Sequence, residues 1–133
     1  MGETRLASLI ASMQPELNDG VFVFATLRQG DRLPAGLVPI MTFRESEGLT
    51  LIVRQDEAEA AGLAGAFRCR WITLTVHSSL EAVGFLAAIT ACLADAGISC
   101  NTVSAFHHDH LFVPENRSGE VIELLTALGS KLR

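Results

Sequence analysis

The sequence predicts an α+β fold in which antiparallel strands are covered by helices on one face. The prediction depends first on residues 70–103, which have the pattern of a strand, a loop, a helix and a second strand. The second observation is the order of elements in the second half of the chain, β-α-β-β-α. Elements of this kind each have one apolar face, and they can bury those faces together in a shared core.

The first strand of this central stretch is predicted by the alternation of its side chains. Ile72, Leu74 and Val76 point to one face, and Trp71, Thr73 and Thr75 point to the other. β-Branched and aromatic residues in this pattern are typical of a half-buried strand. The spacing of Ser78 to Glu81 is that of a capping box, which predicts that a helix begins there and runs to about Ala96. Gly97 is the kind of residue that ends a helix.

The second strand of the central stretch follows directly, at residues 98–103. If the two strands joined by this helix were neighbours in one sheet, they would be parallel. The start of the helix presents unpaired backbone N–H groups and the positive end of the helix dipole, which can hold a small anion. Gly84 leaves room there for a ligand or for a neighbouring backbone, and tight packing of the helix on the sheet explains it equally well.

The remaining elements follow from shorter patterns. Residues 4–13 form a helix with one apolar face, and Pro15 with residues 18–20 stops it and turns the chain. Residues 21–27 form a strand that is apolar on both faces. Two strands at 38–44 and 49–53 make a hairpin, and a short acidic helix covers 55–61. The second half ends with strands to 106 and at 110–113, and with a helix whose apolar residues are Val121, Leu124, Leu125 and Leu128.

The run from Val76 to Val103 resembles an ACT domain, a small regulatory module that binds amino acids and related effectors in many metabolic enzymes. The resemblance is carried by the polar loop at residues 77–84, the Ala- and Leu-rich helix, the Ala-Asp-Ala-Gly-Ile run at 94–98, and the Asn-Thr-Val run at 101–103. The loop departs from the family because it lacks the common Asp-x-x-Gly or Arg-Pro-Gly. Its Gly84 follows a longer run without an Asp.

The whole chain is also similar to a small family of stand-alone tandem ACT-like proteins without an assigned biochemical function. Residues 40–50, 68–72 and 108–114 carry that similarity. The resemblance implies a ferredoxin-like βαββαβ sandwich of two ACT-like units, an incomplete one at 1–66 and a second at 67–133. An ACT fold needs a fourth strand after its last helix, and none is predicted there. We therefore expect the units to share strands, with the strand at 69–77 at their boundary.

The resemblance further implies a non-catalytic sensor or regulator that binds a small metabolite, and the metabolite expected is an amino acid. The implied ligand-binding residues are His77, Ser78, Ser79, Leu80, Val83, Gly84 and Asn101. Backbone N–H groups at the helix start would hold the α-carboxylate, and Asn101 with backbone carbonyls would hold the amino group. Sites of this family often lie between two ACT units, so we expect a homodimer. No cofactor is expected.

Composition restricts the class of protein. The chain has 133 residues, 49% hydrophobic and only 19% charged, which favours an oligomer or a partner that covers apolar area. Its net charge of −5 argues against a nucleic-acid partner. No apolar run approaches the roughly 20 residues that span a bilayer, and no signal peptide is present, so a cytoplasmic protein is expected. Cys69, Cys92 and Cys100 are odd in number and lie in predicted core elements, as reduced thiols would.

The most conspicuous polar cluster is His107-His108-Asp109-His110. Histidine and aspartate are good ligands for zinc, but alternation along a strand places His108 and His110 on one face and the other two residues on the opposite face. Four ligands from one extended segment therefore cannot converge. A polar hairpin tip is the favoured interpretation, and the lining of a ligand pocket is the next.

No catalytic constellation is evident, so the sequence predicts a protein that is not an enzyme. His77, Ser78 and Ser79 could form a base and a nucleophile, but adjacent residues at a strand end face apart, and helix capping explains both serines. Trp71 is either an interface anchor on an open sheet face or a residue of a second core layer. Two rival functions stay open: a structural or adaptor protein that docks through its sheet and has a vestigial ligand site, and, less favoured, a His-cluster metalloprotein.

Overall fold

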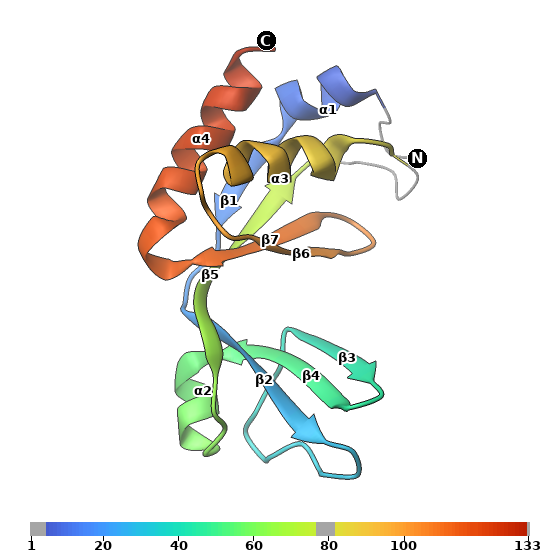
Figure 1. The fold of residues 1–133 in the computed structure, drawn as a ribbon, viewed down its shortest axis with the longest axis vertical. Helices are drawn as coiled ribbons and strands as arrows, with labels where there is room; N and C mark the ends of the chain where they lie inside the picture. Colours follow the sequence, from blue (N-terminus) through green and yellow to red (C-terminus); the bar gives the residue numbers. More distant parts are fainter. Residues whose placement is uncertain (1–4, 77–81, 133) are drawn as a thin grey trace. The chain divides into compact units, whose positions relative to one another are not determined.

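The computed structural model describes residues 5–76 and 82–132 (Figure 1). The chain divides into two compact units, of which unit 1 consists of residues 1–19 and 70–133 and unit 2 of residues 20–69. The family resemblance implies one boundary, between 66 and 67. In the structure the chain passes from unit 2 to unit 1 between Cys69 and Arg70, and it leaves unit 1 for the first time between Asp19 and Gly20. The N-terminal segment therefore lies with the second half of the chain.

The sheet of unit 1 contains a strand that the sequence does not predict. Its strand order is β1 (Gln14–Leu17), β5 (Ala66–Thr75), β7 (Asp109–Pro114) and β6 (Asn101–Ser104). β1 is antiparallel to β5, with Leu17 opposite Ile72, and β6 is antiparallel to β7. The segment that we expect to be a turn is thus an edge strand, where a residue such as Pro15 is tolerated because its missing N–H is not needed by a second neighbour.

β1 takes the place of the fourth strand of a βαββαβ unit, beside the first strand, β5. The strand order agrees with the predicted ferredoxin-like fold, although the fourth strand precedes the others in sequence. β5 and β6, the two strands joined by the central helix, are separated by β7, so the parallel pairing that neighbouring strands would make is absent from this sheet.

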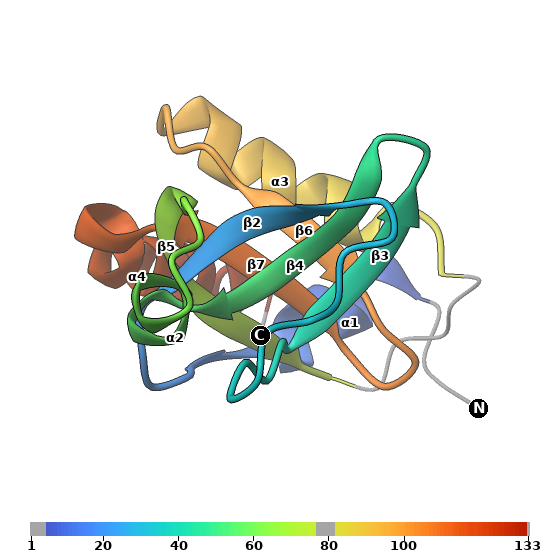
Figure 2. The ribbon, with the colours of Figure 1, turned by 90° about the horizontal axis from the view of Figure 1, so that it is seen from below.

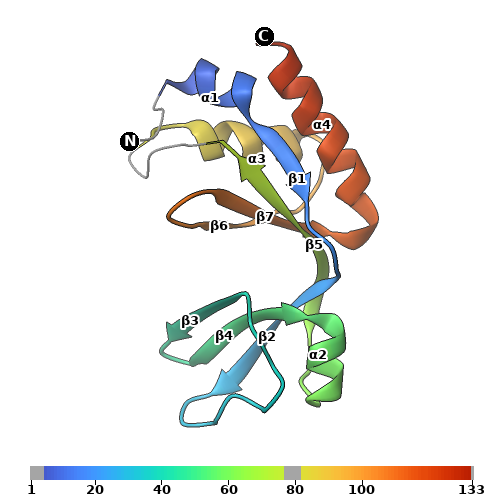
Figure 3. The ribbon, with the colours of Figure 1, turned by 180° about the vertical axis from the view of Figure 1, so that it is seen from behind.

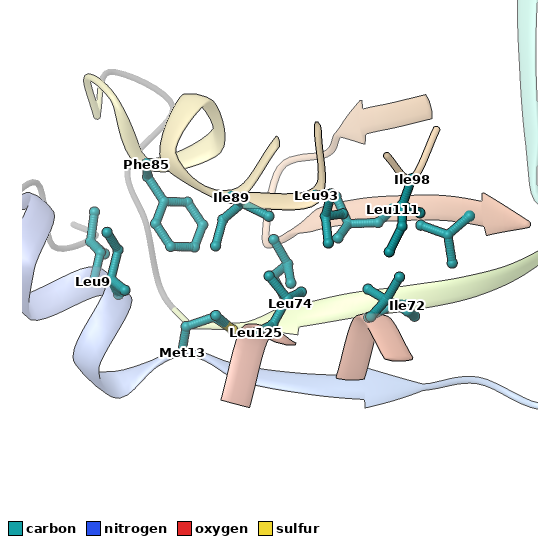
Figure 4. Close-up of a cluster of buried hydrophobic side chains, with 13 residues drawn as sticks. Leu9, Met13, Ile72, Leu74, Phe85, Ile89, Leu93, Ile98, Leu111 and Leu125 are labelled. Atoms are coloured by element: carbon teal, nitrogen blue, oxygen red, sulfur yellow. The ribbon is translucent and has the colours of Figure 1, made fainter. Parts of the chain in front are cut away.

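Helices α1 (Leu6–Ser12), α3 (Phe85–Asp95) and α4 (Ser118–Ser130) lie on one face of this sheet, and a short 3₁₀ turn, η1 (Glu115–Arg117), precedes α4 (Figure 3). Their apolar residues and those of β5 and β7 form one core. Its labelled members in Figure 4 are Leu9, Met13, Ile72, Leu74, Phe85, Ile89, Leu93, Ile98, Leu111 and Leu125. The alternation predicted for β5 is confirmed, because Ile72 and Leu74 point to the helices.

The central helix begins later than the sequence predicts. α3 begins at Phe85, and Gly84 is its N-cap residue with a left-handed φ of 89°. A left-handed residue cannot continue a right-handed helix in the N-terminal direction, and residues 82–84 are not helical. The expected capping box at Ser78 to Glu81 falls on residues 77–81, which lie outside the described part of the chain.

Unit 2 has the strand order β3 (Met41–Glu45), β4 (Gly48–Arg54), β2 (Phe22–Arg28) and residues 66–69 of β5. β2 and β3 each pair antiparallel with β4, and Figure 2 shows the three strands side by side. α2 (Gln55–Ala60) packs on β2 and β4. Val23, Leu27, Leu37, Leu51, Val53 and Ala58 form a separate core. No helix connects the first two strands of this unit, residues 29–40 being irregular.

Residues 66–69 of β5 pair with β2 through a β-bulge. Phe22 lies opposite Cys69 and Phe24 opposite Ala66, so one residue is gained on the β5 side. Phe67 lies in this bulge with a φ of 60°, a backbone conformation that is uncommon for an aromatic residue. In the described part of the chain, no helix is long and apolar enough to cross a membrane.

The assignment of the N-terminal segment to unit 1 predicts the effect of two substitutions in α1. Leu9 is 0% exposed in the core, whereas Leu6 is 40% exposed on the same helix. We expect Leu9→Ala to lower the free energy of unfolding by about 2–5 kcal/mol, because it leaves a cavity, and Leu6→Ala to change it by about 0.5 kcal/mol or less. Urea denaturation followed by circular dichroism measures both. If Leu9→Ala changed the free energy of unfolding as little as Leu6→Ala, α1 would not belong to the core.

Candidate functional site

The start of α3 is the site that the sequence singles out. The backbone N–H of Ala88 donates to the Gly84 carbonyl at 2.9 Å, so the N–H groups of the preceding helical residues have no acceptor within the helix. No described side chain caps this end. A Cβ atom on Gly84 would lie 3.7 Å from Leu6 Cδ2, an ordinary contact. The backbone conformation, and not crowding, is therefore what requires glycine here.

The other predicted ligand-binding residues divide between described and undescribed parts of the chain. Val83 is 84% exposed beside Gly84, and Asn101 is exposed at the beginning of β6, opposite Phe112. His77, Ser78, Ser79 and Leu80 lie outside the described residues. Among the described contacts, no hydrogen bond joins Asn101 to Val83 or Gly84. The structure thus places in one unit a helix start without a cap from the described residues and an exposed edge strand, while residues 77–81 lie outside the described part of the chain.

The face of the unit 1 sheet opposite the helices carries a polar network that the sequence analysis missed. Trp71 Nε1–H donates to His110 Nδ1 at 2.9 Å, and Thr73 Oγ1 lies 3.1 Å from the same nitrogen. Asn18 Nδ2 donates to Thr73 Oγ1 at 3.0 Å and to the Trp71 carbonyl at 3.2 Å. Alternation places Trp71 and Thr73 together, but nothing in the sequence reveals that β7 lies beside β5 and brings His110 to them.

This network determines which nitrogen of His110 carries the proton. An indole N–H can only donate, so Nδ1 must be the unprotonated acceptor and the neutral ring carries its hydrogen on Nε2. Burial and the nearby His108 lower the pKa of His110, while Asp109 opposes the shift. The neutral ring is therefore favoured. With Nδ1 bound to Trp71 and Nε2 protonated, His110 has no free lone pair for a metal ion.

The remaining histidines of the cluster lie at the tip of the β6–β7 hairpin, where the Ala105 N–H donates to the His108 carbonyl at 3.0 Å. The centroids of the His107 and Phe106 rings lie 5.0 Å apart with the ring planes at 72°, and His108 Nδ1 lies 3.4 Å from the Val76 carbonyl oxygen. Within residues 5–76 and 82–132, no three His, Cys, Asp or Glu side chains are placed to hold a metal ion.

Of the three cysteines, Cys69 is fully buried, whereas Cys92 and Cys100 are half-buried against the unit 1 core. Cys69 is buried, with Sγ 3.4 Å from the Phe22 carbonyl, and no described cysteine is in a disulfide. Burial raises the pKa of the Cys69 thiol to about 12 and that of Cys100 to about 11. Since the thiolate is the nucleophile, neither residue is suited to covalent catalysis at neutral pH.

A shallow depression of about 340 Å³ lies in unit 2, also unforeseen from the sequence. It is lined by Ala35, Gly36, Arg54, Asp56, Glu57, Ala60 and Ala61. Its charged groups already have partners, because Glu57 Oε1 accepts from the Val38 N–H at 2.8 Å and Arg54 Nε lies 3.6 Å from Asp56 Oδ1. Small residues and internally paired charges make it a weaker candidate than the start of α3.

Comparison with known protein families finds two matches in series. A model described as an ACT domain matches residues 1–70, and a second model with the same description matches residues 66–127. No curated protein matches the chain.

Solved structures agree with this assignment. A Vibrio cholerae protein of unknown function, described as a possible transport protein, is 42% identical, with 93% of this chain and 95% of that chain covered and a TM-score of 0.85. An Agrobacterium tumefaciens protein is 20% identical, and the match covers 88% of this chain and 89% of that chain with a TM-score of 0.72. The regulatory subunit of aspartate kinase from Thermus thermophilus shares the fold at 10% identity, with 88% and 96% covered and a TM-score of 0.66.

The raised pKa values of the buried thiols predict slow alkylation of the folded protein. At pH 8 we expect Cys69 and Cys100 to react with iodoacetamide about 100-fold or more slowly in the folded chain than in 8 M urea, because both burial and the small thiolate fraction protect them. Mass spectrometry of the labelled peptides measures each rate. Comparable rates in the folded and unfolded protein would contradict the burial that raises the pKa values of these two thiols.

Proposed function

Since the chain belongs to the ACT domain family, we propose that it is a non-catalytic regulatory protein that senses an amino acid. The observation that carries the proposal is the start of α3, where the N-cap residue Gly84 holds a left-handed conformation and offers no side chain to the first N–H groups of the helix. Those groups and the helix dipole together attract a carboxylate.

In this proposal the backbone N–H groups that follow Gly84 bind the α-carboxylate of the ligand. Hydrogen bonds to a charged group are stronger than those between neutral groups, so this contact fixes the orientation of the ligand. Asn101 and nearby backbone carbonyls bind the amino group, and the exposed Val83 side chain contacts the ligand's apolar part. His77, Ser78, Ser79 and Leu80 complete the site from the loop before the helix.

The aspartate kinase regulatory subunit supports this proposal by fold alone. That protein is regulatory, and a shared ACT fold is compatible with a regulatory role for this chain. The loop of this chain lacks the Asp that is common in the family. In this proposal residues 77–83 therefore determine which ligand is selected, and the ligand preference of other family members does not carry over. We further propose that it works in the cytoplasm as a homodimer, whose second copy closes the site.

The rival proposal, a docking adaptor, is supported by a separate observation in unit 2. The edge strand β3 and the segment before it expose large apolar residues, with Val38 71% and Phe43 65% exposed. Exposed apolar side chains along an unpaired strand edge are suited to binding another chain. In that case no small molecule would bind at α3, and the apolar edge would be covered in the working assembly.

A thermal-shift screen against the twenty amino acids tests the proposal. A ligand at about 100 times its dissociation constant should add about 2.7 kcal/mol to the free energy of unfolding. We expect one chemical class of amino acids to raise the melting temperature, and Gly84→Leu to abolish that rise in a protein that still folds. EDTA and zinc are included as controls for a metal site.

A matched control is available at the other end of the same helix. Gly97 has a φ of 72° with no atom within 4 Å of its would-be Cβ, so Gly97→Leu introduces similar backbone strain away from the site. The ligand-induced shift should survive Gly97→Leu. A shift lost equally in both variants, or no shift with any amino acid, would favour the adaptor, and destabilisation by EDTA would favour a metalloprotein.

A further inference from the structure

We propose that the hydrogen bond from Trp71 Nε1–H to His110 Nδ1 is a pH-responsive latch between β5 and β7 of unit 1. The latch is closed while the imidazole is neutral and opens when Nδ1 takes a proton. This gives the chain a response to mild acid that is separate from the proposed amino-acid site.

The geometry of the indole makes the latch selective for the neutral ring. The ring centroids of Trp71 and His110 lie 5.7 Å apart and the ring planes meet at 57°, while Trp71 Nε1 and His110 Nδ1 are 2.9 Å apart. Trp71 makes a second contact with β7 by stacking on Phe112, with the ring centroids 6.4 Å apart and the ring planes at 20°. This stacking limits how far the indole can turn away from His110. A proton on Nδ1 would point at the indole N–H, and two donors cannot share a hydrogen bond.

Thr73 and Asn18, which hydrogen-bond to the latch residues, are neutral, and Arg70 of β5 adds a positive charge to the network by donating from Nη2 to the Asn18 carbonyl at 3.0 Å. Thr73 is only 9% exposed and lies 3.1 Å from His110 Nδ1. Asn18 donates its backbone N–H to the Trp71 carbonyl at 2.9 Å, and its side chain reaches both Trp71 and Thr73. The network therefore joins the segment after β1 to β5 and β7. Opening the latch loosens the contact among these strands at one point.

The described charges near His110 compensate an imidazolium only in part, because the favourable effect of Asp109 is outweighed by burial and by His108. From β1, Glu16 lies opposite Thr73 on this face, but it accepts a hydrogen bond from Thr75 at 3.0 Å. From β7, His108 lies on the same face with its ring 6.4 Å away, and Asp109 accepts from Ser104 Oγ at 2.5 Å. The neighbouring residues of β6, Asn101 and Val103, carry no charge. Helices α1, α3 and α4 lie on the other face of the sheet (Figure 3).

The sign of the pH effect follows from proton linkage. The pKa of His110 is lowered in the folded protein by burial and by His108, so below about pH 6.5 the unfolded chain binds this proton before the folded chain does. Stability due to the latch is present above that pH. It is lost as the pH falls from there towards the pKa of the folded state.

Trp71 is the only tryptophan of the chain, so its fluorescence reports the latch directly. We expect one reversible change in tryptophan emission as the pH falls below 6.5, with no loss of secondary structure. His110→Gln retains an acceptor and does not titrate, so the change should vanish. His107→Gln, an exposed neighbour at the hairpin tip, should leave it intact. A change that persists in His110→Gln, or no change in the native protein, overturns the proposal.

Imidazole ¹⁵N NMR of the native protein provides a test that needs no variant to fold. At pH 8 we expect His110 to be the Nε2–H tautomer and to titrate below the ordinary histidine range. Trp71→Phe, which keeps an aromatic ring but removes the N–H donor, should raise its pKa towards that range. An Nδ1–H tautomer at pH 8, or a His110 that titrates at or above the ordinary value, overturns the latch.

Discussion

Unit 1 depends on the antiparallel pairing of β1 with β5. β5 supplies Ile72 and Leu74 to the core beneath the helices, and β1 covers the edge of β5 that β7 does not. The same segment places α1 over the sheet, so Leu9 and Met13 fill the core beside α3 and α4. A long-range pairing of this kind costs loop-closure entropy, which the apolar area buried by α1 offsets. The unit can therefore form a complete sheet without a strand after α4.

The two faces of this sheet have different chemistry because the strands alternate. The face under the helices is apolar, and the opposite face carries Trp71, Thr73 and His110. Buried polar groups stabilise a fold only when they are hydrogen-bonded, and the network among these residues meets that requirement while His110 is neutral. The start of α3 differs, since its N–H groups have no partner among the described residues.

Much of unit 1 could be predicted from the sequence. The alternation of residues 71–76 and the apolar stripes of the helices depend on local periodicity, and the core contains Ile72, Ile89, Leu93 and Val121 as those patterns require. The family resemblance correctly indicated ACT domains. β1 could not be predicted, because a short segment with a proline has no strand propensity of its own and forms only through its pairing with β5.

The site could be predicted only in part. A glycine near the helix start was evident, but Ser78 and Ser79 suggested a start several residues too early, since a capping sequence does not reveal that Gly84 adopts a left-handed conformation. The Trp71–His110 contact joins residues that are far apart in the chain, and no local pattern specifies that β7 lies beside β5. Local sequence therefore predicts helices and strands and which of their faces are apolar. Side-chain contacts between strands, such as Trp71 with His110, depend on the order of the strands in the sheet.

The central claim is that a carboxylate-bearing ligand binds at the start of α3. An amide NMR titration with the amino acid that most stabilises the protein tests it most directly. We expect the backbone N–H signals of Phe85, Leu86 and Asn101 to shift together and to saturate at one dissociation constant, while those of Gly36 and Ala60 in the unit 2 depression stay unchanged. Saturable shifts confined to Gly36 and Ala60, or the absence of any shift near Phe85, would contradict the account.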